Sequence, residues 1–108
     1  MTHSDACRLV LLELSRLGCL AWRCEVGLFT DERGNRRTIG VPGQADIAGY
    51  APDGAGISVE VKTGSGRLNG KQIPWRDAVL ARHARHHVAR PDYAGWKEDL
   101  ARAVAPNS

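Results

Sequence analysis

Long apolar runs are missing from this 108-residue chain. No stretch approaches the roughly 18 to 20 apolar residues that a membrane-spanning helix needs. The run from Leu9 to Leu12 is too short for the apolar core of a signal peptide, and Glu13 interrupts it. The sequence therefore predicts a cytoplasmic protein without a membrane anchor.

Cysteine is also scarce, and its spacing is irregular. Cys7, Cys19 and Cys24 form no CxxC pair and are too few for a disulfide framework. The three histidines between residues 83 and 87 have no second ligand cluster beside them, so they do not indicate a zinc site. We interpret the cysteines as reduced thiols that mainly fill space.

Lysine is the rarer of the two basic residue types, since 12 of the 15 basic side chains are arginine. The net charge is +3, and the arginines cluster at Arg33, Arg36 and Arg37 and between residues 67 and 90. Arginine binds phosphate in a bidentate manner, so this distribution is compatible with nucleic acid. A solvated basic surface explains the composition alone equally well.

The hydrophobic pattern predicts one α/β domain with a small mixed sheet flanked by helices. A helix is expected over residues 5–17 with Ser4 as N-cap, and its apolar arc includes Glu13. The turn Pro52-Asp53-Gly54 should pair two strands in antiparallel fashion. The expected order is α-β-β-β-α-β-α: helix 5–17, strand 19–29, a hairpin-like connection or mobile loop 30–43, strands 45–51 and 56–63, helix 69–85, strand 86–90 and helix 93–104.

Three polar residues on the two central strands carry the candidate chemistry. If the turn pairs these strands, Asp46 and Glu60 lie side by side, and Lys62 projects to the same side as Glu60. Two carboxylates this close repel each other unless a cation lies between them, and Mg²⁺ prefers such oxygen ligands. The arrangement suits metal-assisted hydrolysis of a phosphodiester. Glu-x-Lys by itself is a weak motif, and an exposed strand face with one Glu–Lys pair is the simpler alternative.

Longer motifs favour the chemical interpretation. Pro42-Gly43-Gln44-Ala45-Asp46 is followed by Val59-Glu60-Val61-Lys62-Thr63, by Gly66-Arg67-Leu68, and by Gln72 and Trp75. Together with residues 22–27, this pattern resembles the VRR-Nuc branch of the PD-(D/E)XK nuclease superfamily. The chain departs from it at Ala45, where the superfamily name has proline, and at residues 84–87, which lack the usual glycine.

The resemblance implies a single nuclease domain over residues 1–108 with a restriction-endonuclease-like core. It further implies a compact, phage-type, Mg²⁺-dependent (or Mn²⁺-dependent) DNA endonuclease that acts as a homodimer on branched or Holliday-junction DNA. The metal ligands it implies are Glu13, Asp46, Glu60 and the backbone carbonyl of Val61. Lys62 would serve catalysis, and Gln72 would belong to the motif that follows the active site.

Basic side chains outside this cluster are the expected DNA contacts. Arg36 and Arg37 lie in the connection between strands, where a basic loop can follow a phosphate backbone. Arg23, Arg67 and Lys71 complete the expected set. Two other interpretations remain open: a DNA-binding module of the same fold that does not cut, and a structural or accessory subunit.

Overall fold

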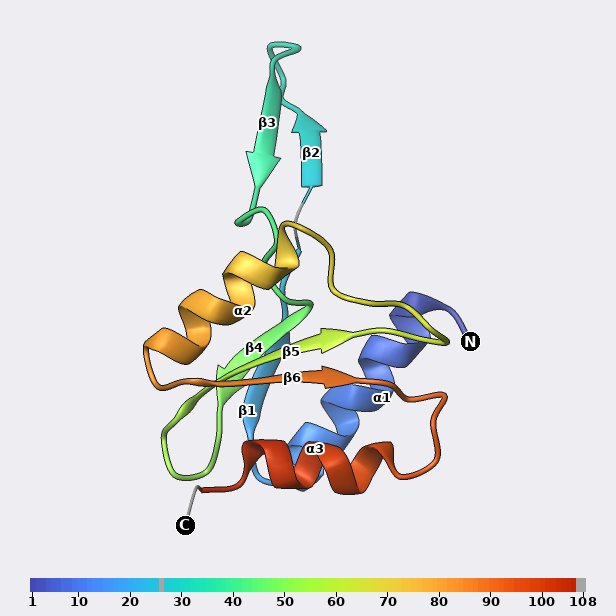
Figure 1. The fold of residues 1–108 in the computed structure, drawn as a ribbon. Helices are drawn as coiled ribbons and strands as arrows, with labels where there is room; N and C mark the ends of the chain where they lie inside the picture. The colour runs from blue at the N-terminus through green and yellow to red at the C-terminus, as the bar shows by residue number, and fades with distance from the viewer. Residues whose placement is uncertain (26, 107–108) are drawn as a thin grey trace.

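A four-stranded sheet forms the centre of the protein, in a computed structural model that describes residues 1–25 and 27–106 (Figure 1). The strands lie in the order β1-β4-β5-β6. The first three pair in antiparallel fashion and β6 runs parallel to β5, so the sheet is mixed, as the sequence predicts. The bounds are β1 Leu20–Arg23, β4 Ile47–Tyr50, β5 Gly56–Val61 and β6 Arg85–Ala89.

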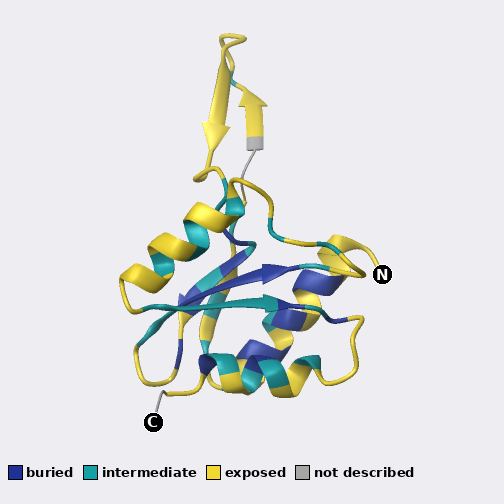
Figure 2. Ribbon diagram, viewed as in Figure 1, coloured by how far each residue is buried: buried dark blue, intermediate teal, exposed yellow. Residues whose placement is uncertain are grey.

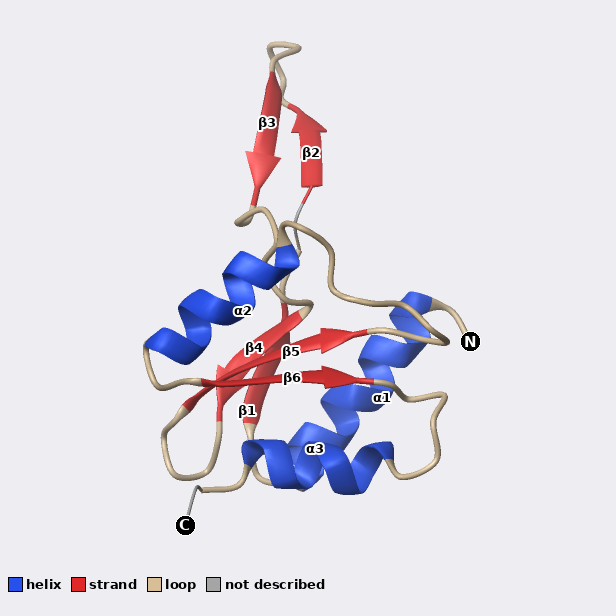
Figure 3. Ribbon diagram, in the orientation of Figure 1, coloured by secondary structure: helices blue, strands red, loops and turns tan. Residues whose placement is uncertain are grey.

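Three helices cover this sheet, as Figure 3 shows. α1 (His3–Arg16) and α3 (Trp96–Val104) pack against one face. α2 (Gln72–Ala81) lies on the opposite face, where the Trp75 Nε1–H donates to Ser58 Oγ at 3.0 Å. Ser58 points away from the α1 side because successive strand residues alternate between faces.

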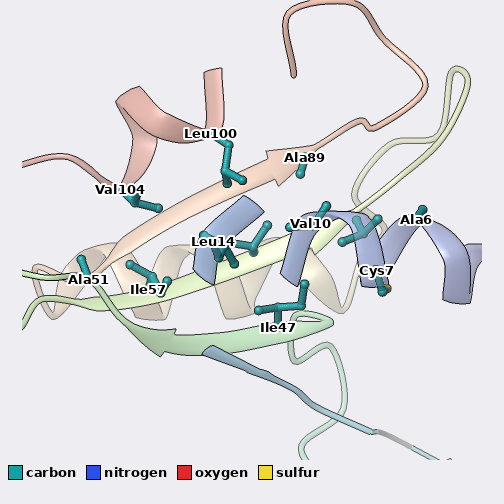
Figure 4. Packing of buried hydrophobic residues seen from close by; sticks show 12 residues of the cluster. Ala6, Cys7, Val10, Leu14, Ile47, Ala51, Ile57, Ala89, Leu100 and Val104 are labelled. Carbon is teal, nitrogen blue, oxygen red and sulfur yellow. The ribbon is translucent and has the colours of Figure 1, made fainter. Parts of the chain in front are cut away.

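The core lies between the sheet and the helices α1 and α3 (Figure 4). Leu14 of α1 and Leu100 of α3 are fully buried against Ile47, Val59 and other apolar strand residues. Fully burying one such side chain contributes about 1.5–3 kcal/mol, so this layer provides the main stabilisation of the fold.

A second, two-stranded sheet projects from the body. β2 (Gly27–Thr30) and β3 (Arg36–Ile39) pair in antiparallel fashion and form an arm whose side chains are largely exposed (Figure 2). Setting the arm aside, the elements follow the predicted order α-β-β-β-α-β-α. The prediction of one continuous strand over residues 19–29 was wrong, because β1 and β2 belong to different sheets.

Several predicted helix ends also differ from the structure. α1 begins earlier, because Thr2 is its N-cap and forms a capping box with Asp5, which leaves Ser4 inside the first turn. α2 ends at Ala81, ahead of the predicted Arg85. α3 begins at Trp96 because Asp92, the predicted cap, instead accepts a hydrogen bond from the Gly64 N–H at 2.6 Å.

Among the described residues, no helix is both long and apolar enough to cross a membrane.

Candidate functional site

Asp46 and Glu60 meet at one end of the central sheet. Ile47 is paired with Val59, so the antiparallel register continues to place Asp46 opposite Glu60. The Asp46 backbone carbonyl accepts the Cys24 N–H at 2.7 Å, and its side-chain Oδ2 accepts the Val61 N–H at 2.8 Å. These bonds hold Asp46 between the end of β1 and the end of β5, and fix the direction of its carboxylate.

The two carboxyl groups affect each other's ionisation. Burial is the largest cause that raises the pKa of Glu60 to about 8, and the hydrogen bond and negative charge of Asp46 add to it. Burial also opposes the ionisation of Asp46, but bonds from Glu60, the Val61 N–H and His3 outweigh it and lower the pKa of Asp46. Glu60 therefore holds a proton at neutral pH, and a cation bound between the two carboxyl groups could replace that proton.

Lys62 lies directly after β5, on the same side of the strand as Glu60. Its positive charge partly offsets the rise in the pKa of Glu60. Its backbone N–H donates to the Ala89 carbonyl at 3.0 Å, which fixes the chain where the side chain begins. The structure therefore brings together Asp46, Glu60 and Lys62, the three residues that the strand pattern selected.

An open pocket of about 470 Å³ lies beside the carboxyl pair. Three predicted site residues line it besides Asp46 and Glu60: Arg23, Lys71 and Gln72. Gln72 begins α2, and its Oε1 accepts the Asn69 N–H at 3.0 Å while Asn69 Oδ1 accepts the Gln72 N–H. This reciprocal pair orients the first turn of α2 towards the pocket.

Gly43 allows the wall of the pocket to close. It has φ of +82°, and a Cβ built on it would lie 2.1 Å from the Lys71 carbonyl oxygen. A larger residue would therefore separate the segment before Asp46 from the segment before α2. The two segments supply Gln44 and Lys71 to the same pocket.

His3 and Cys7 also lie at this site, and neither was selected from the sequence. His3 Nε2 is 3.0 Å from Asp46 Oδ1 and 3.5 Å from Cys7 Sγ. The predicted N-cap at Ser4 left His3 outside the helix and hid this pair. With Thr2 as the cap, His3 and Cys7 are four residues apart on one helical face, which is the signal that would have found them.

Cys7 is a buried thiol, 1% exposed. Burial and the negative charge of Asp46 raise its pKa to about 11, although Arg23 acts in the opposite direction. Cys7 is therefore a neutral thiol in the metal-free protein. All three cysteines are free, in agreement with the sequence analysis.

Glu13 is buried, as its place in the apolar arc predicts, but it lies far from this cluster. It accepts hydrogen bonds from Arg16, which is also the largest cause that lowers the pKa of Glu13. At about 1.5 Å per residue, Glu13 lies about 15 Å along α1 from His3. The structure therefore does not bring Glu13 to the carboxyl pair, and His3 occupies the place expected for a ligand from this helix.

The remaining predicted DNA contacts, Arg36, Arg37 and Arg67, do not line the pocket. Arg36 and Arg37 lie on the projecting arm, where Arg37 Nε pairs with Asp31 Oδ2 at 3.0 Å. The arm begins and ends at the pocket, because Glu25 precedes it, Gly43 follows it, and both line the pocket. Arg67 is exposed in the loop between β5 and α2.

No family model matches this chain, and no curated protein matches it either.

The donor set decides which ions suit the site. The oxygens of Asp46 and Glu60 suit Mg²⁺, and a cation between these facing carboxyl groups would relieve their repulsion. His3 Nε2 and Cys7 Sγ are softer donors that Mg²⁺ does not prefer. The carboxyl pair thus fits the expected ion, and the two softer ligands are additional.

Proposed function

We propose that this chain is a metal-dependent DNA endonuclease with a restriction-endonuclease-like core, similar to the VRR-Nuc branch. The observation that carries the proposal is the pair of a buried Glu60 and a partly exposed Asp46, held opposite each other at an open pocket, with the Lys62 charge acting on Glu60. A structural protein has no need of a buried carboxyl group next to a second carboxylate, because burying Glu60 there costs free energy that a proton or a cation offsets.

The residues of the chain divide the work of phosphodiester hydrolysis. Asp46 and Glu60 would hold the divalent ion, with the Val61 carbonyl as a further ligand. Once bound, that ion supplies charge neutralisation and activation of water. Lys62 carries a positive charge that stabilises the phosphate as negative charge develops on it. Gln72 limits the space opposite the strands and positions the scissile phosphate.

Binding of the DNA backbone is assigned to basic groups around the pocket. Arg23 and Lys71 line the pocket and would contact the phosphates next to the cut. Arg36 and Arg37 on the arm, with Arg67 in the loop after β5, would contact phosphates further away. Such contacts position the duplex without reading its sequence.

The side chains of the arm are a further argument that the ligand is a nucleic acid. A two-stranded hairpin is marginally stable by itself in water. This one nevertheless exposes Leu28, Phe29 and Ile39 beside its arginines, with Phe29 47% exposed. A nucleic acid lying along the arm would cover these side chains and pair the arginines with phosphate.

A homodimer is part of the proposal. Leu20, Trp22 and Tyr50 share one face of β1 and β4, and they are 69%, 47% and 53% exposed. α2 covers the β5–β6 half of that face and leaves this half open. A two-fold copy packed here would bury the patch and present two metal sites to two strands, as cleavage of junction DNA requires.

Cleavage of plasmid and four-way-junction DNA tests the function directly. Asp46→Asn and Glu60→Gln should abolish Mg²⁺- or Mn²⁺-dependent cleavage while DNA binding survives. Asp77→Asn, which changes an exposed aspartate of α2 in the same way, is the matched control and should cut normally. Cleavage by both active-site variants at the wild-type rate would refute the assignment.

The second candidate, a DNA-binding module that does not cut, predicts a different result. It would bind junction DNA with a steep salt dependence and give no cleavage with any divalent ion. The intact set of Asp46, Glu60 and Lys62 argues against it, because a module that only binds gains nothing from a carboxyl pair that repels phosphate.

A further inference from the structure

The N-terminus of α1 adds a second kind of donor to the site. His3 Nε2, Cys7 Sγ and a carboxylate oxygen of Asp46 all lie within 4.8 Å of one another. They come from two segments far apart in the chain, which meet because α1 packs against the end of the sheet. His3 and Asp46 also line the open pocket, so the cluster faces solvent on one side.

A single nitrogen of His3 faces both partners. Nε2 is 3.0 Å from Asp46 Oδ1 and 3.5 Å from Cys7 Sγ, whereas a neutral imidazole nitrogen can donate only one proton. A hydrogen bond to Asp46 accounts for the first distance, and the four-residue spacing on α1 brings the buried thiol to the same nitrogen. A common ion would use all three atoms at once.

The distances match the edges of a metal coordination shell. Tetrahedral bonds of about 2.0–2.1 Å to a histidine nitrogen and about 2.3 Å to a thiolate separate those two atoms by about 3.5 Å. A carboxylate oxygen at about 2.0–2.2 Å lies about 2.9–3.4 Å from the nitrogen for bond angles between a right angle and the tetrahedral value. Both separations from His3 Nε2 agree with such a shell, and the third, between Cys7 Sγ and the Asp46 carboxylate, is within 4.8 Å.

We propose that His3, Cys7 and Asp46 bind a divalent transition-metal ion of the zinc and cobalt type, with the fourth position open to the pocket. Mg²⁺ does not prefer nitrogen or sulfur, whereas zinc accepts all three donors. Three protein ligands and one open position are typical of catalytic rather than structural zinc sites. The thiol releases its proton to solvent when the ion binds.

This inference rests on the proposed function for the role of the site, and it adds a transition-metal ion beside the carboxyl pair, bound through His3 and Cys7 of α1. Asp46 belongs both to this cluster and to the carboxyl pair, so the ion would lie beside Glu60. The binding of the ion can nevertheless be measured without any cleavage. The two proposals therefore fail independently.

Cobalt absorption provides the test. The full chain, with any affinity tag removed and treated with a chelator, is titrated with Co²⁺ and then with Zn²⁺. We expect a thiolate-to-cobalt charge-transfer band with the visible bands of four-coordinate cobalt, both of which Zn²⁺ removes by displacement. Cys7→Ser should abolish the charge-transfer band and weaken Co²⁺ binding by roughly ten-fold or more.

Two other thiols serve as controls. Cys19→Ser should keep the band, because the charged groups acting on Cys19 are Arg85 and Asp53, away from this cluster. Cys24→Ser should also keep it, although Cys24 lines the pocket. Because Cys7 is buried, its replacement can disturb the core, whereas His3 is exposed and can be replaced without that effect. His3→Ala should weaken Co²⁺ binding while the protein stays folded.

Each outcome has a defined meaning. A wild-type protein without a sulfur-to-cobalt band, or a band that Cys24→Ser removes and Cys7→Ser retains, would overturn the inference. Mg²⁺-dependent cleavage without Co²⁺ binding would leave the nuclease standing and refute this cluster as a metal site. Binding of Co²⁺ through Cys7 without cleavage of any DNA would support the cluster and refute the nuclease.

Discussion

Replacing Glu60 by glutamine should stabilise the metal-free protein at pH 8, although it removes a charged residue from a nuclease-like site. The folded-state pKa of Glu60 is about 8, against 4.5 for the free side chain. Because the folded-state pKa of Glu60 is raised, the full contribution of this carboxyl group to the free energy of unfolding is present below pH 4.5. It is lost as the pH rises through 8, because the fold favours the protonated carboxyl group. Glutamine keeps the neutral shape at every pH.

The expected magnitude follows from that difference. At about 1.4 kcal/mol per pH unit, moving a pKa from 4.5 to about 8 corresponds to at most about 5 kcal/mol at high pH. Sharing of the proton with Asp46 and relaxation of the site reduce this, and we expect about 2 kcal/mol. For a domain of this size that is about 8 °C in melting temperature.

Thermal unfolding in chelator between pH 5 and pH 8 measures the effect. His86 and His87, whose pKa values burial lowers, act in the opposite direction below about pH 6.5, so variant and wild type are compared at each pH. The difference should be near zero at pH 5 and reach about 8 °C at pH 8. Glu32→Gln, on the exposed turn of the arm, is the matched control and should show no such trend.

The same melting experiment is then repeated with Mg²⁺ in place of chelator. At pH 8 Mg²⁺ should raise the melting temperature of the wild type by replacing the proton between the two carboxyl groups, and should do so little in Glu60→Gln. A temperature difference that does not change with pH, or a Mg²⁺ effect that the variant retains, would refute this account of the carboxyl pair.

Further predictions concern the rest of the molecule. Lys62→Met should lower the cleavage rate at saturating DNA by about 10²-fold or more while Mg²⁺ still raises the melting temperature, because the lysine acts on the phosphate and not on the ion; a normal single-turnover rate would exclude that role. Glu13→Gln should cut DNA at close to the wild-type rate, because Glu13 lies at the far end of α1; a strong loss of activity would return it to the site. Arg36→Ala combined with Arg37→Ala should weaken binding to all DNA sequences alike and flatten the salt dependence of binding, because a protein with fewer phosphate contacts releases fewer counterions. An unchanged salt slope in a fluorescence titration would place the DNA elsewhere. Trp22→Glu should convert the free protein to a monomer in sedimentation, because it puts a charge in the exposed patch; a wild type that already sediments as a monomer would remove the dimer from the proposal.

The local pattern of the chain is enough to determine the centre of the fold. Alternating apolar residues and the turn at Pro52-Asp53-Gly54 predict β4 and β5 and their antiparallel pairing, and that register brings Asp46 opposite Glu60. Lys62 follows by the same alternation. These predictions succeed because strand pairing across a tight turn depends on residues that are close in the sequence.

Other features depend on contacts that no local pattern encodes. Both Thr2 and Ser4 are good N-caps, and the choice between them decides whether His3 is helical. Strand propensity is high in both Leu20–Arg23 and Gly27–Thr30, yet the first segment joins the central sheet while the second pairs with β3 and forms the projecting arm.

The candidate ligands on α1 show most clearly which features the sequence determines and which only the tertiary structure decides. The sequence determines that His3, Cys7 and Glu13 share a helix and that Glu13 lies in its apolar arc. Only the docking of α1 on the sheet decides which end of the helix meets Asp46, and it is the end that carries His3 and Cys7. Burial of Val10 and Leu14 against the strands fixes that docking, because a helix shifted along its axis would lose this packed apolar contact.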